Sequence, residues 1–346
     1  MIPTTQRAAV YYRNADVRIE ERPVPKIGPG ELLVKIRASG ICGTDVLEWY
    51  RIKKAPIVLG HEVAGEIVAV GEGVKRYAVG QRIAVSHHVP CNTCHYCLAG
   101  YHTACETLHT TNFEPGGFCE YVRIPALQAD RGVFPLPDGM TFDEACWFEP
   151  LACVVRGQRS VGLKPGQAVA VLGSGISGIL HVALAKAVGA GRIVATDITP
   201  ERREMALRFG ADAAFDARDD VPKRIREALG RPADLVVVCA GAISAFQQAL
   251  GSIDRGGTIL CFATTDPGVE LSVPLNDFWR NDITLKPSYG NSPYDAAVAL
   301  ELIAARRVPV AEMITHRFTL DQAPEAFRLM SMQGGSHLKV VIQPHG

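Results

Sequence analysis

The chain has 346 residues, of which 47% are hydrophobic and 21% charged, and its 36 basic and 36 acidic residues give a formal net charge of zero. This composition excludes wholesale disorder, and the balanced charge disfavours a protein built to bind nucleic acid or an acidic membrane surface. At about 150 residues per domain, the length predicts about two domains, with a core large enough to need no disulfides.

The ten cysteines therefore need another explanation. The N-terminal segment lacks a basic stretch followed by an apolar one, which disfavours a secretory signal. No uninterrupted apolar run reaches the about 18 residues of a membrane span. We therefore expect a cytoplasmic protein, in which disulfides are rare and cysteines serve as core residues, metal ligands or nucleophiles.

Roughly the first 150 residues are expected to be rich in β-strands. Short apolar runs at residues 32–36, 63–70 and 82–85 alternate with glycine-containing turns at residues 28–30 and 71–73. Many short strands with regular turn signals favour a β-barrel or a β-sandwich.

A cysteine and a Gly-His-Glu segment lie within this β-rich part. Cys42 stands in Gly-Ile-Cys-Gly-Thr-Asp, and His61 and Glu62 follow in Gly-His-Glu-Val-Ala-Gly. A cysteine, a histidine and a carboxylate would supply the about three protein ligands of a catalytic zinc ion. Adjacent strand residues point to opposite faces, so both side chains would face the metal only if Gly60 and Gly65 permit a turn. Without such a turn, Glu62 would contact a metal ligand rather than the metal itself. Taken alone, His61 would be interpreted as a buried core histidine.

Several polar residues near these motifs are candidate substrate contacts. The residues that closely follow the first cysteine would contact hydroxyl, carboxylate or phosphate groups: Trp49, Tyr50, Arg51, Lys53 and Lys54. For the two lysines, a solvated basic turn is an equal alternative. His87 and His88 would face the substrate cleft or would simply end a strand.

Four more cysteines form a compact pattern, C-x2-C-x2-C-x7-C, at Cys91, Cys94, Cys97 and Cys105. The C-x2-C spacing lets a tight turn present two thiolates to one metal ion, and four thiolates close a tetrahedral shell with no open position. We therefore expect a structural zinc site. An iron–sulfur cluster is the alternative, which the absence of a Cys-Pro ending disfavours. The other five cysteines are expected in the core: Cys119, Cys146, Cys153, Cys239 and Cys261.

From about residue 154, predicted strands and helices alternate. Strands are expected at residues 169–172, 192–196, 235–239 and 258–262, and helices at 176–188, 200–209 and 243–250. This alternation predicts a parallel sheet with helices on both faces. A helix near residues 294–304 and a strand at 339–342 are expected to complete the chain.

Gly173, Gly175 and Gly178 form a G-x-G-x-x-G pattern between a predicted strand and a predicted helix. In a dinucleotide site they would form the tight turn, admit the pyrophosphate and let the helix pack closely. Asp197 ends the next strand, where it would accept hydrogen bonds from the adenosine ribose and repel a 2′-phosphate. NAD is therefore expected in preference to NADP, although Arg202 and Arg203 would be able to pair with a phosphate. An ordinary strand–turn–helix with packing glycines is the alternative.

Together these motifs resemble the zinc-dependent medium-chain dehydrogenase/reductase family over essentially the whole chain. The segment Phe148-Glu149-Pro150-Leu151 and the Cys-Gly-Thr-Asp turn are similar to those of the polyol (sorbitol/iditol) and threonine dehydrogenase branch. The resemblance implies an α/β protein with a GroES-like β-barrel catalytic domain and a Rossmann domain. Residues 1–154 and 293–346 would form the catalytic domain with both zinc sites, and residues 155–292 would bind NAD.

The resemblance also implies two zinc ions per chain and a set of site residues. Cys42, His61 and Glu62 would hold the catalytic zinc, with Glu149 as a ligand or one contact further out. Thr44 would take the substrate proton. The relay histidine common five residues after the zinc cysteine is replaced by Leu47, so the proton would leave through Glu149, Glu48 or water. Cofactor contacts are implied for Gly173, Gly175, Ile176, Ser177, Gly178, Asp197, Arg202, Cys239, Ala240 and Ser288.

The implied activity is a reversible, zinc-dependent oxidation of a secondary alcohol, in a polyol or sugar-like substrate, to a ketone with NAD(P). The alternatives are a dehydrogenase for an amino alcohol such as threonine, a sugar phosphate or a simple alcohol, and a non-catalytic nucleotide-binding protein. A homodimer or homotetramer is implied, paired through residues 257–289. No nucleic acid or membrane partner is expected.

Overall fold

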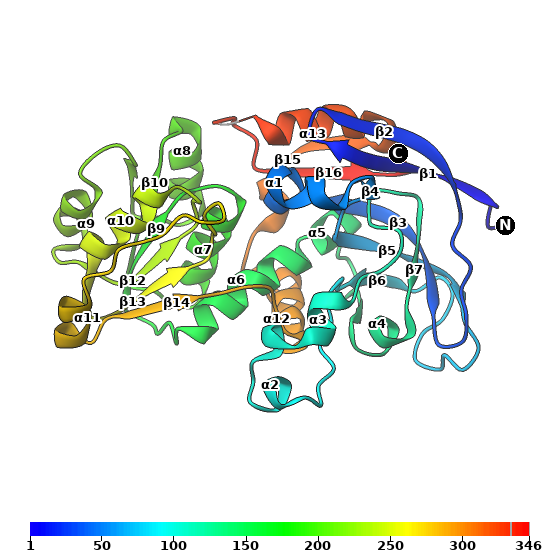
Figure 1. The fold of residues 1–346 in the computed structure, drawn as a ribbon, viewed down its shortest axis with the longest axis horizontal. Coiled ribbons are helices and arrows are strands. Elements are labelled where there is room, and N and C mark those ends of the chain that lie inside the picture. The colour runs from blue at the N-terminus through cyan, green and yellow to red at the C-terminus, as the bar shows by residue number, and fades with distance from the viewer. Residues whose placement is uncertain (333, 346) are drawn as a thin grey trace. The chain divides into compact units, whose positions relative to one another are not determined.

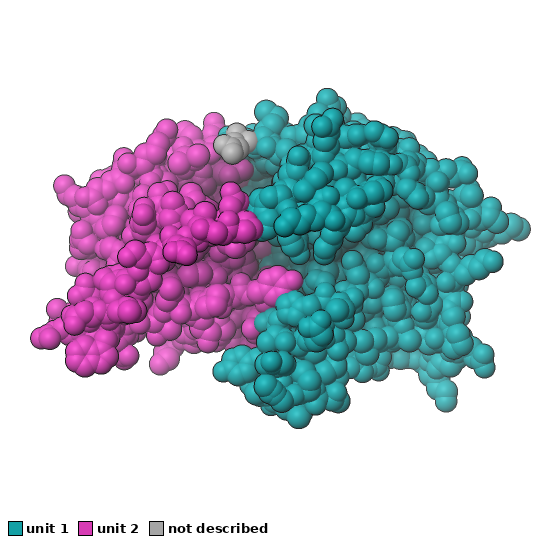
Figure 2. Space-filling model, viewed as in Figure 1, with its two compact units in different colours: residues 1–152, 291–346 teal, residues 153–290 magenta. Residues whose placement is uncertain are grey.

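The computed structural model describes residues 1–332 and 334–345. The chain divides into two compact units, coloured separately in Figure 2: unit 1 comprises residues 1–152 and 291–346, and unit 2 comprises residues 153–290. Within the described residues, no helix has both the length and the apolar character needed to span a membrane.

Unit 1 is built mainly from antiparallel strands, as the sequence predicts for the first part of the chain. A small sheet has the order β2-β1-β4, and a larger one has the order β15-β16-β3-β5-β6-β8, with β7 also paired to β3 (Figure 1). The strands of the small sheet are β1 (Thr5–Arg13), β2 (Asp16–Pro23) and β4 (Ile57–Val58). Those of the large sheet are β3 (Leu32–Gly40), β5 (Glu62–Val70), β6 (Arg82–Val85), β7 (Tyr121–Ile124), β8 (Val133–Pro135), β15 (Ile314–Thr319) and β16 (Lys339–Gln343).

Short helices connect and cover these strands. They are α1 (Glu48–Arg51), α2 (His95–Leu98), α3 (Glu106–Thr110), α4 (Ala126–Arg131), α5 (Phe142–Ala145), α12 (Pro293–Ala304) and α13 (Ala323–Ser331). The 3-10 turn η1 (Gly43–Val46) follows β3. Trp147, Phe118 and Phe327 are among the largest fully buried side chains in the core of unit 1.

The C-terminal segment returns to the centre of unit 1 as strand β16. β16 pairs antiparallel with β3, opposite Gly40, and β3 pairs on its other side with β5, where Gly40 lies opposite Glu62. A Cβ atom on Gly40 would lie 2.7 Å from Cε of Lys339 and would clash with the carboxylate of Glu62. A glycine is therefore required where the three strands bring these side chains together.

Unit 2 is a six-stranded parallel sheet in the order β11-β10-β9-β12-β13-β14. Its strands are β9 (Ala168–Leu172), β10 (Arg192–Asp197), β11 (Ala213–Asp216), β12 (Ala233–Val238), β13 (Ile253–Cys261) and β14 (Thr284–Pro287). Its helices are α7 (Ile176–Ala187), α8 (Pro200–Phe209), α9 (Val221–Leu229), α10 (Ile243–Ser252) and α11 (Leu275–Asn281), while α6 (Phe148–Ser160) begins in unit 1 and ends in unit 2.

The connections of unit 2 explain its sequence pattern. α7 packs with α8 and α9 packs with α10, one pair on each face of the sheet (Figure 1). Every residue of β9 is buried, as expected for a strand covered on both faces. From β9 the strand order proceeds to β10 and β11 on one side, and from β12 it proceeds to β13 and β14 on the other. The order therefore reverses between β9 and β12, and open parallel sheets bind ligands at such a point. The predicted parallel sheet with helices on both faces is confirmed.

Candidate functional site

The structure brings Cys42, His61 and Glu62 together at the adjoining ends of β3 and β5. One ligand atom of each residue lies within 4.8 Å of the others. Cys42 follows β3, and Glu62 is the first residue of β5, so His61 precedes the strand and escapes its alternation. Gly60 makes this possible because its φ of 93° lies in the left-handed region that favours glycine. The turn that His61 and Glu62 need in order to face one metal ion is therefore present at Gly60.

Asp45 contacts two residues of this cluster, Cys42 and His61. Its carboxylate is completely buried, with Oδ2 accepting the Cys42 amide at 3.1 Å and Oδ1 lying 3.4 Å from Nδ1 of His61. The contact at Nδ1 leaves Nε2 of His61 available to a metal ion. Burial opposes protonation of His61, but the negative charges of Asp45 and Cys42 outweigh it and raise its pKa well above the usual value. Metal binding would therefore have to displace a proton.

Glu62 has a second partner besides the cluster. Its Oε2 accepts a hydrogen bond from Nζ of Lys339, and both side chains are almost fully buried. The ammonium group also lies 5.0 Å from the ring centroid of Trp147. A buried charge needs a partner, so Lys339 makes the buried carboxylate tolerable whether or not a metal is bound. Lys339 was not foreseen from the sequence as a site residue.

Thr44 lies beside the cluster, and its hydroxyl donates to Sγ of Cys42 at 3.3 Å. Arg51, at the end of α1, donates to the Thr44 carbonyl at 2.9 Å, to the Thr44 hydroxyl at 3.1 Å and to Oδ1 of Asp45 at 3.2 Å. The sequence pointed to Arg51 only as one of several substrate contacts, because nothing in its spacing indicates that the short helix turns it back onto Thr44.

Glu149 lies near the cluster but outside the set of three. It is buried near the start of α6, where Asn291 donates to its Oε1 at 3.3 Å. Nδ1 of His87 lies 3.9 Å from the same oxygen, and the His87 ring is 4.7 Å from the His61 ring. The His87 imidazole thus contacts both Glu149 and a member of the cluster. Burial and the neighbouring His88 hold the pKa of His87 well below its usual range, so this imidazole is neutral.

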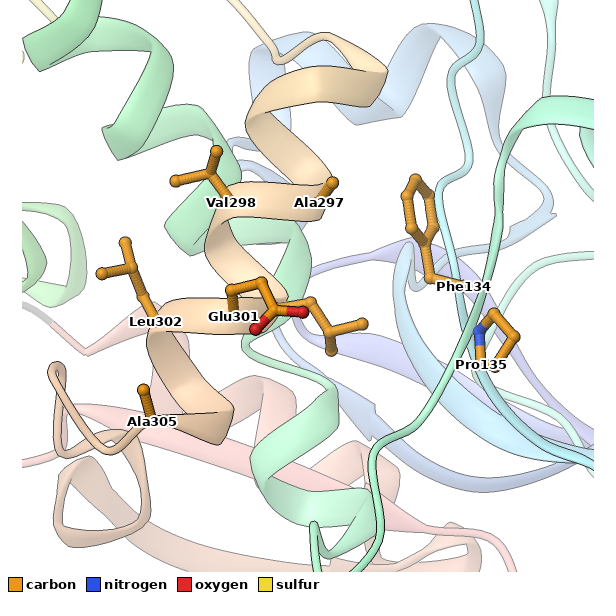
Figure 3. Close-up of a pocket in the computed structure, with 8 residues that line it drawn as sticks. Phe134, Pro135, Ala297, Val298, Glu301, Leu302 and Ala305 are labelled. Carbon is orange, nitrogen blue, oxygen red and sulfur yellow. The ribbon is translucent and has the colours of Figure 1, made fainter.

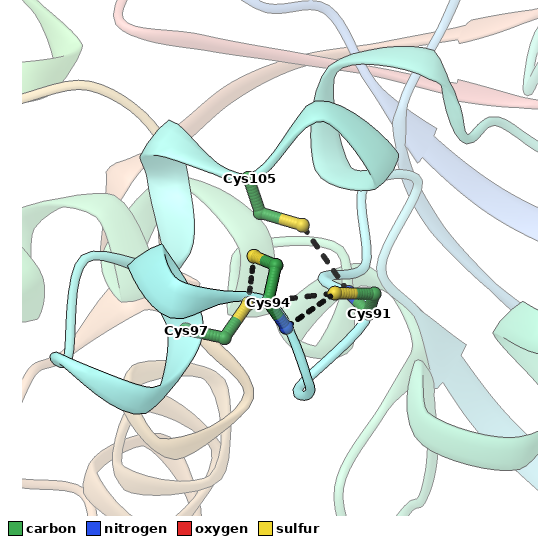
Figure 4. Close-up of side chains that lie close together, drawn as sticks. All are labelled: Cys91, Cys94, Cys97 and Cys105. Atoms are coloured by element: carbon green, nitrogen blue, oxygen red, sulfur yellow. Dashed lines mark hydrogen bonds between the residues drawn. The ribbon is translucent and has the colours of Figure 1, made fainter.

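The four cysteines of the second motif form a separate group in a small lobe of unit 1 (Figure 4). Sγ of Cys97 lies 3.5 Å from Sγ of Cys94 and 4.0 Å from Sγ of Cys91. A tetrahedral zinc ion with Zn–S bonds of about 2.3 Å separates its sulfurs by about 3.8 Å. These two separations lie on either side of this value, and all four sulfurs lie within 4.8 Å of one another, which is compatible with such an ion.

Backbone amides donate hydrogen bonds to these sulfurs and so stabilise negative charge on them. The amides of Thr93 and Cys94 donate to Sγ of Cys91 at 3.4 and 3.2 Å, and the Cys91 amide donates to Sγ of Cys105 at 3.3 Å. Hydrogen bonds from Thr93 lower the pKa of Cys91 to about 5, whereas burial raises the pKa of Cys97 to about 12. Without a metal, the group therefore favours a thiolate at some of its cysteines but not at all four. A divalent metal ion would stabilise the state with four thiolates.

The lobe has little core apart from its sulfurs. Its buried cluster consists of Cys97, Cys105 and Leu108, with Cys91 and Cys94 packed against them. By contrast, Tyr96, Leu98 and Tyr101 are exposed. The lobe's order therefore depends on what joins the four sulfurs.

In unit 2, the predicted glycine turn lies at the carboxyl end of β9. Gly173 has a φ of 97°, and a Cβ atom there would meet Ala240 at 3.0 Å. A Cβ atom on Gly178 would collide with the Gly173 carbonyl, whereas one on Gly175 would meet nothing within 4 Å. The first and third glycines are thus required by packing, and the second leaves open space before the α7 N-terminus, as a phosphate site needs.

The other residues predicted to contact the cofactor gather around the same edge of the sheet. Ile176 and Ser177 begin α7, Asp197 ends β10, Arg202 lies on α8, Cys239 and Ala240 follow β12, and Ser288 follows β14. The hydroxyl of Ser288 and Nε of Arg202 are buried without a hydrogen-bond partner.

Asp197 is buried and holds two backbone amides, those of Ser174 through Oδ2 and Thr199 through Oδ1, each at 2.8 Å. Arg203 donates to the Asp197 carbonyl at 2.8 Å and to Asp216 at 3.1 Å. The carboxylate is therefore fixed at the strand end. The neighbouring Arg203–Asp216 pair was not anticipated, because Asp216 ends a strand that the sequence pattern did not reveal.

Of the predicted core cysteines, Cys119 and Cys146 are fully buried, and Cys153, Cys239 and Cys261 are partly buried. A cavity of about 530 Å³ lies elsewhere in unit 1, between α12 and the end of β8 (Figure 3). Phe134, Pro135 and the aliphatic side chains of α12 line it, with Glu301 as its single ionisable group. It contains no predicted site residue and no group suited to redox chemistry.

Comparison with known proteins identifies two domain families in the chain. Residues 28–138 match the alcohol dehydrogenase GroES-like domain, and residues 177–305 match the zinc-binding dehydrogenase family. Sorbitol dehydrogenase of Gallus gallus is 31% identical over 97% of this chain and 96% of its own, and that of Bacillus subtilis is 32% identical over 99% of each. L-Threonine 3-dehydrogenase of Rhizobium johnstonii is 32% identical over 94% of each chain.

Solved structures resemble the chain over nearly its full length. Alcohol dehydrogenase TADH of Thermus sp. ATN1 superposes with a TM-score of 0.87 at 28% identity, covering 97% of this chain and 99% of its own. For 2R,3R-butanediol dehydrogenase of Bacillus subtilis the TM-score is 0.85 at 29% identity, with 98% and 99% covered. A Sinorhizobium meliloti 1021 protein solved with bound NADP reaches 0.87 at 28% identity, with 99% and 100% covered. The predicted GroES-like and Rossmann folds are confirmed.

Proposed function

The chain belongs to the zinc-dependent medium-chain alcohol dehydrogenase family, and from this we propose that it reversibly oxidises a secondary alcohol of a polyol or sugar-like substrate to a ketone. The observation that carries the proposal is the convergence of Cys42, His61 and Glu62, with the Thr44 hydroxyl alongside. Similarity to two sorbitol dehydrogenases and to a butanediol dehydrogenase supports a substrate with more than one hydroxyl.

Two zinc ions per chain are part of the proposal. Cys91, Cys94, Cys97 and Cys105 would hold a structural ion, since their sulfur separations fit a closed tetrahedron. Cys42, His61 and Glu62 would hold the second, with one position left for the substrate. Glu149, which His87 contacts beside the cluster, would be a ligand or would lie one contact further out and exchange with water.

The residues of the chain would prepare the substrate for oxidation. At such a site zinc polarises the alcohol oxygen, and the oxidised nicotinamide accepts the hydride. Thr44 would accept the hydrogen bond of the substrate hydroxyl and, on taking its proton, would release its own hydroxyl hydrogen to the next acceptor. Asp45 would keep Nε2 of His61 directed at the metal. Leu47 cannot pass the proton onward, so it would leave through Glu149, Glu48 or water.

The catalytic domain of this proposal corresponds to unit 1, and the nucleotide domain to unit 2. The pyrophosphate would lie over Gly175 at the N-terminus of α7, where nothing occupies the space above the glycine. Asp197 would bind the adenosine ribose and disfavour a 2′-phosphate, which supports NAD as the preferred cofactor. The NADP-bound structure from Sinorhizobium meliloti shares only 28% identity and argues for testing both cofactors.

Changing Asp197 is expected to shift the preference between NAD and NADP. Asp197→Asn keeps the acceptor for one backbone amide but removes the negative charge. Because a hydrogen bond to a charged group is worth about 1.5–3 kcal/mol, we expect KM for NAD to rise about 10-fold or more. KM for NADP should rise less or fall, since the repulsion of its phosphate is gone.

The measurement is kcat/KM for both cofactors with one substrate. Asp216→Asn serves as the matched control, because Asp216 ends the adjacent strand and pairs with Arg203 and Arg218. An unchanged NAD-to-NADP ratio in Asp197→Asn would contradict the assigned role.

The activity itself is tested by NADH or NADPH formation with a panel of substrates. Polyols, inositols, threonine, sugar phosphates and short primary alcohols would each be offered with NAD and with NADP. The proposal expects the highest kcat/KM with a polyol and loss of activity after zinc removal. Oxidation of threonine alone would favour the second candidate, which the 32% identity to L-threonine 3-dehydrogenase supports. Activity confined to simple primary alcohols would exclude a polyol dehydrogenase.

A homodimer or homotetramer is also proposed, paired through the region of residues 257–289. β14 is an edge strand of the sheet, and the exposed apolar side chains of Leu275, Trp279 and Leu285 lie in or near it. An unpaired edge beside exposed apolar groups favours association with a second copy. The cytoplasmic location stays a prediction.

A further inference from the structure

Arg51 makes an unusual set of contacts for a residue that follows the candidate zinc cysteine by a short helix. Its side chain is only 13% exposed, and its guanidinium meets three acceptors: the Thr44 carbonyl at 2.9 Å, the Thr44 hydroxyl at 3.1 Å and Oδ1 of Asp45 at 3.2 Å. The guanidinium also lies 4.7 Å from the ring centroid of Tyr50. The group is thus held on one side by an aromatic ring and on the other by two residues of the site.

We propose that Arg51 is a positioning residue that fixes the Thr44 hydroxyl so that it can accept the hydrogen bond of the substrate hydroxyl, while the buried Asp45 anchors the guanidinium of Arg51. This inference rests on the proposed dehydrogenase function. An arginine remains protonated in proteins and only donates hydrogen bonds, so Arg51 cannot itself carry the substrate proton. Its role is to determine where the Thr44 hydrogen and lone pairs point.

A threonine hydroxyl has one hydrogen and two acceptor lone pairs. Arg51 occupies one lone pair, and the hydrogen is directed to Sγ of Cys42 at 3.3 Å. One lone pair is left to accept from a substrate hydroxyl bound next to Cys42. Without Arg51, the exposed Thr44 side chain would be held only by its contact with Cys42, and the hydroxyl would sample other orientations.

The second contact anchors Arg51 itself. Oδ1 of Asp45, whose side chain is fully buried, is shared by Arg51 and by Nδ1 of His61. The permanent positive charge of Arg51 and this buried carboxylate stabilise each other. The guanidinium is therefore held in one place, from which it reaches the Thr44 hydroxyl.

The test compares Arg51→Ala, Thr44→Val and the double variant. Displacement of a reacting group by about 1 Å costs about 100-fold in rate, so Arg51→Ala should lower kcat by 10- to 100-fold and leave KM for NAD within about twofold. Because Arg51 acts through Thr44, its removal from Thr44→Val should cost little more. Added guanidinium or ethylguanidinium should restore part of the Arg51→Ala activity, whereas methylammonium should not. Arg51→Lys, which keeps the charge but loses the planar fork, should retain intermediate activity.

Two further readouts do not depend on turnover. Metal analysis of Arg51→Ala should show the same zinc content as the unmodified chain, since neither Cys42 nor His61 is changed. A crystal structure of the variant should show the Thr44 hydroxyl turned away from its original direction or in two orientations. Arg22→Ala is the matched control, because Arg22 forms only a surface ion pair with Glu20 and is not near the cluster residues in sequence or sheet.

The outcomes separate this inference from the proposed function. Additive effects of Arg51→Ala and Thr44→Val, loss of zinc from Arg51→Ala, or an unmoved Thr44 hydroxyl would each overturn the positioning role. If the unmodified chain oxidises no alcohol of the panel, the proposed function fails. The Thr44 orientation in the Arg51→Ala structure then decides the positioning role by itself.

Discussion

Cys42→Ser is expected to abolish alcohol oxidation and to release one of the two zinc ions that we propose for each chain. Thiolate is a preferred zinc ligand, and a serine hydroxyl, which is not deprotonated at neutral pH, cannot replace its charge. Lewis-acid stabilisation of a reacting oxygen is worth several kcal/mol, so kcat should fall by about 1,000-fold or more. The sulfur also accepts the hydrogen bond of Thr44, and that contact is lost as well.

The measurement is zinc content per chain together with kcat. Cys261→Ser is the matched control: Cys261 is a partly buried cysteine of unit 2, outside both metal groups, and its replacement should change neither quantity. A single zinc ion in the unmodified chain, with the count unaltered by Cys42→Ser, would rule out a catalytic zinc at this cluster.

Cys105→Ser should remove the other zinc ion and disorder the lobe of residues 91–105. Cys105 is buried, and its sulfur accepts the Cys91 amide in a lobe whose only other buried core residues are Cys97 and Leu108. Structural zinc contributes apparent binding energies of about 10–16 kcal/mol in small domains, far more than this core would supply. The lobe should therefore lose its order, while the Cys42 group in the neighbouring strands keeps its ligands.

Limited proteolysis with mass spectrometry would locate the disorder, and zinc analysis would count the remaining ion. Cleavage should concentrate within residues 91–105 in Cys105→Ser, and the melting temperature should fall. His95→Ala is the control, since His95 is exposed on α2 and outside the four-sulfur group. If His95→Ala releases zinc, or Cys105→Ser retains both ions, the four-cysteine assignment is wrong.

The parallel sheet of unit 2 was readable from the sequence because its strands are buried on both faces. Such strands become continuous apolar runs, and β9, for example, is Ala-Val-Ala-Val-Leu. The predicted helix at residues 200–209 agrees with α8, which begins at a proline and ends before Gly210. In contrast, β2 has the sequence Asp-Val-Arg-Ile-Glu-Glu-Arg-Pro and buries only Val17. Strands of this kind are stabilised by their partners and carry no apolar pattern of their own.

The candidate site divides in the same way. Cys42, His61 and Glu62 were recognisable because ligand types and short spacings survive in a linear sequence, and their ligand atoms do come together. Lys339 was invisible, since it is 277 positions from Glu62 and reaches it only through the pairing of β16 with β3. The placement of His87 beside Glu149 likewise depends on where two separate segments end in space. Roles that arise from tertiary pairing leave no local signature.

The return of β16 has a consequence for how the protein is made. Lys339 leaves the ribosome after all of unit 2 has been synthesised, whereas Glu62 emerges early. Until then the buried carboxylate of Glu62 has no lysine to balance it, and the β3–β5 pair lacks the neighbouring strand that closes over it. The nascent chain would thus hold an unfinished centre while the six-stranded sheet is already complete. Completion of the centre therefore follows synthesis of unit 2, and termination of the chain shortly before Lys339 should leave a folded unit 2 and an inactive unit 1.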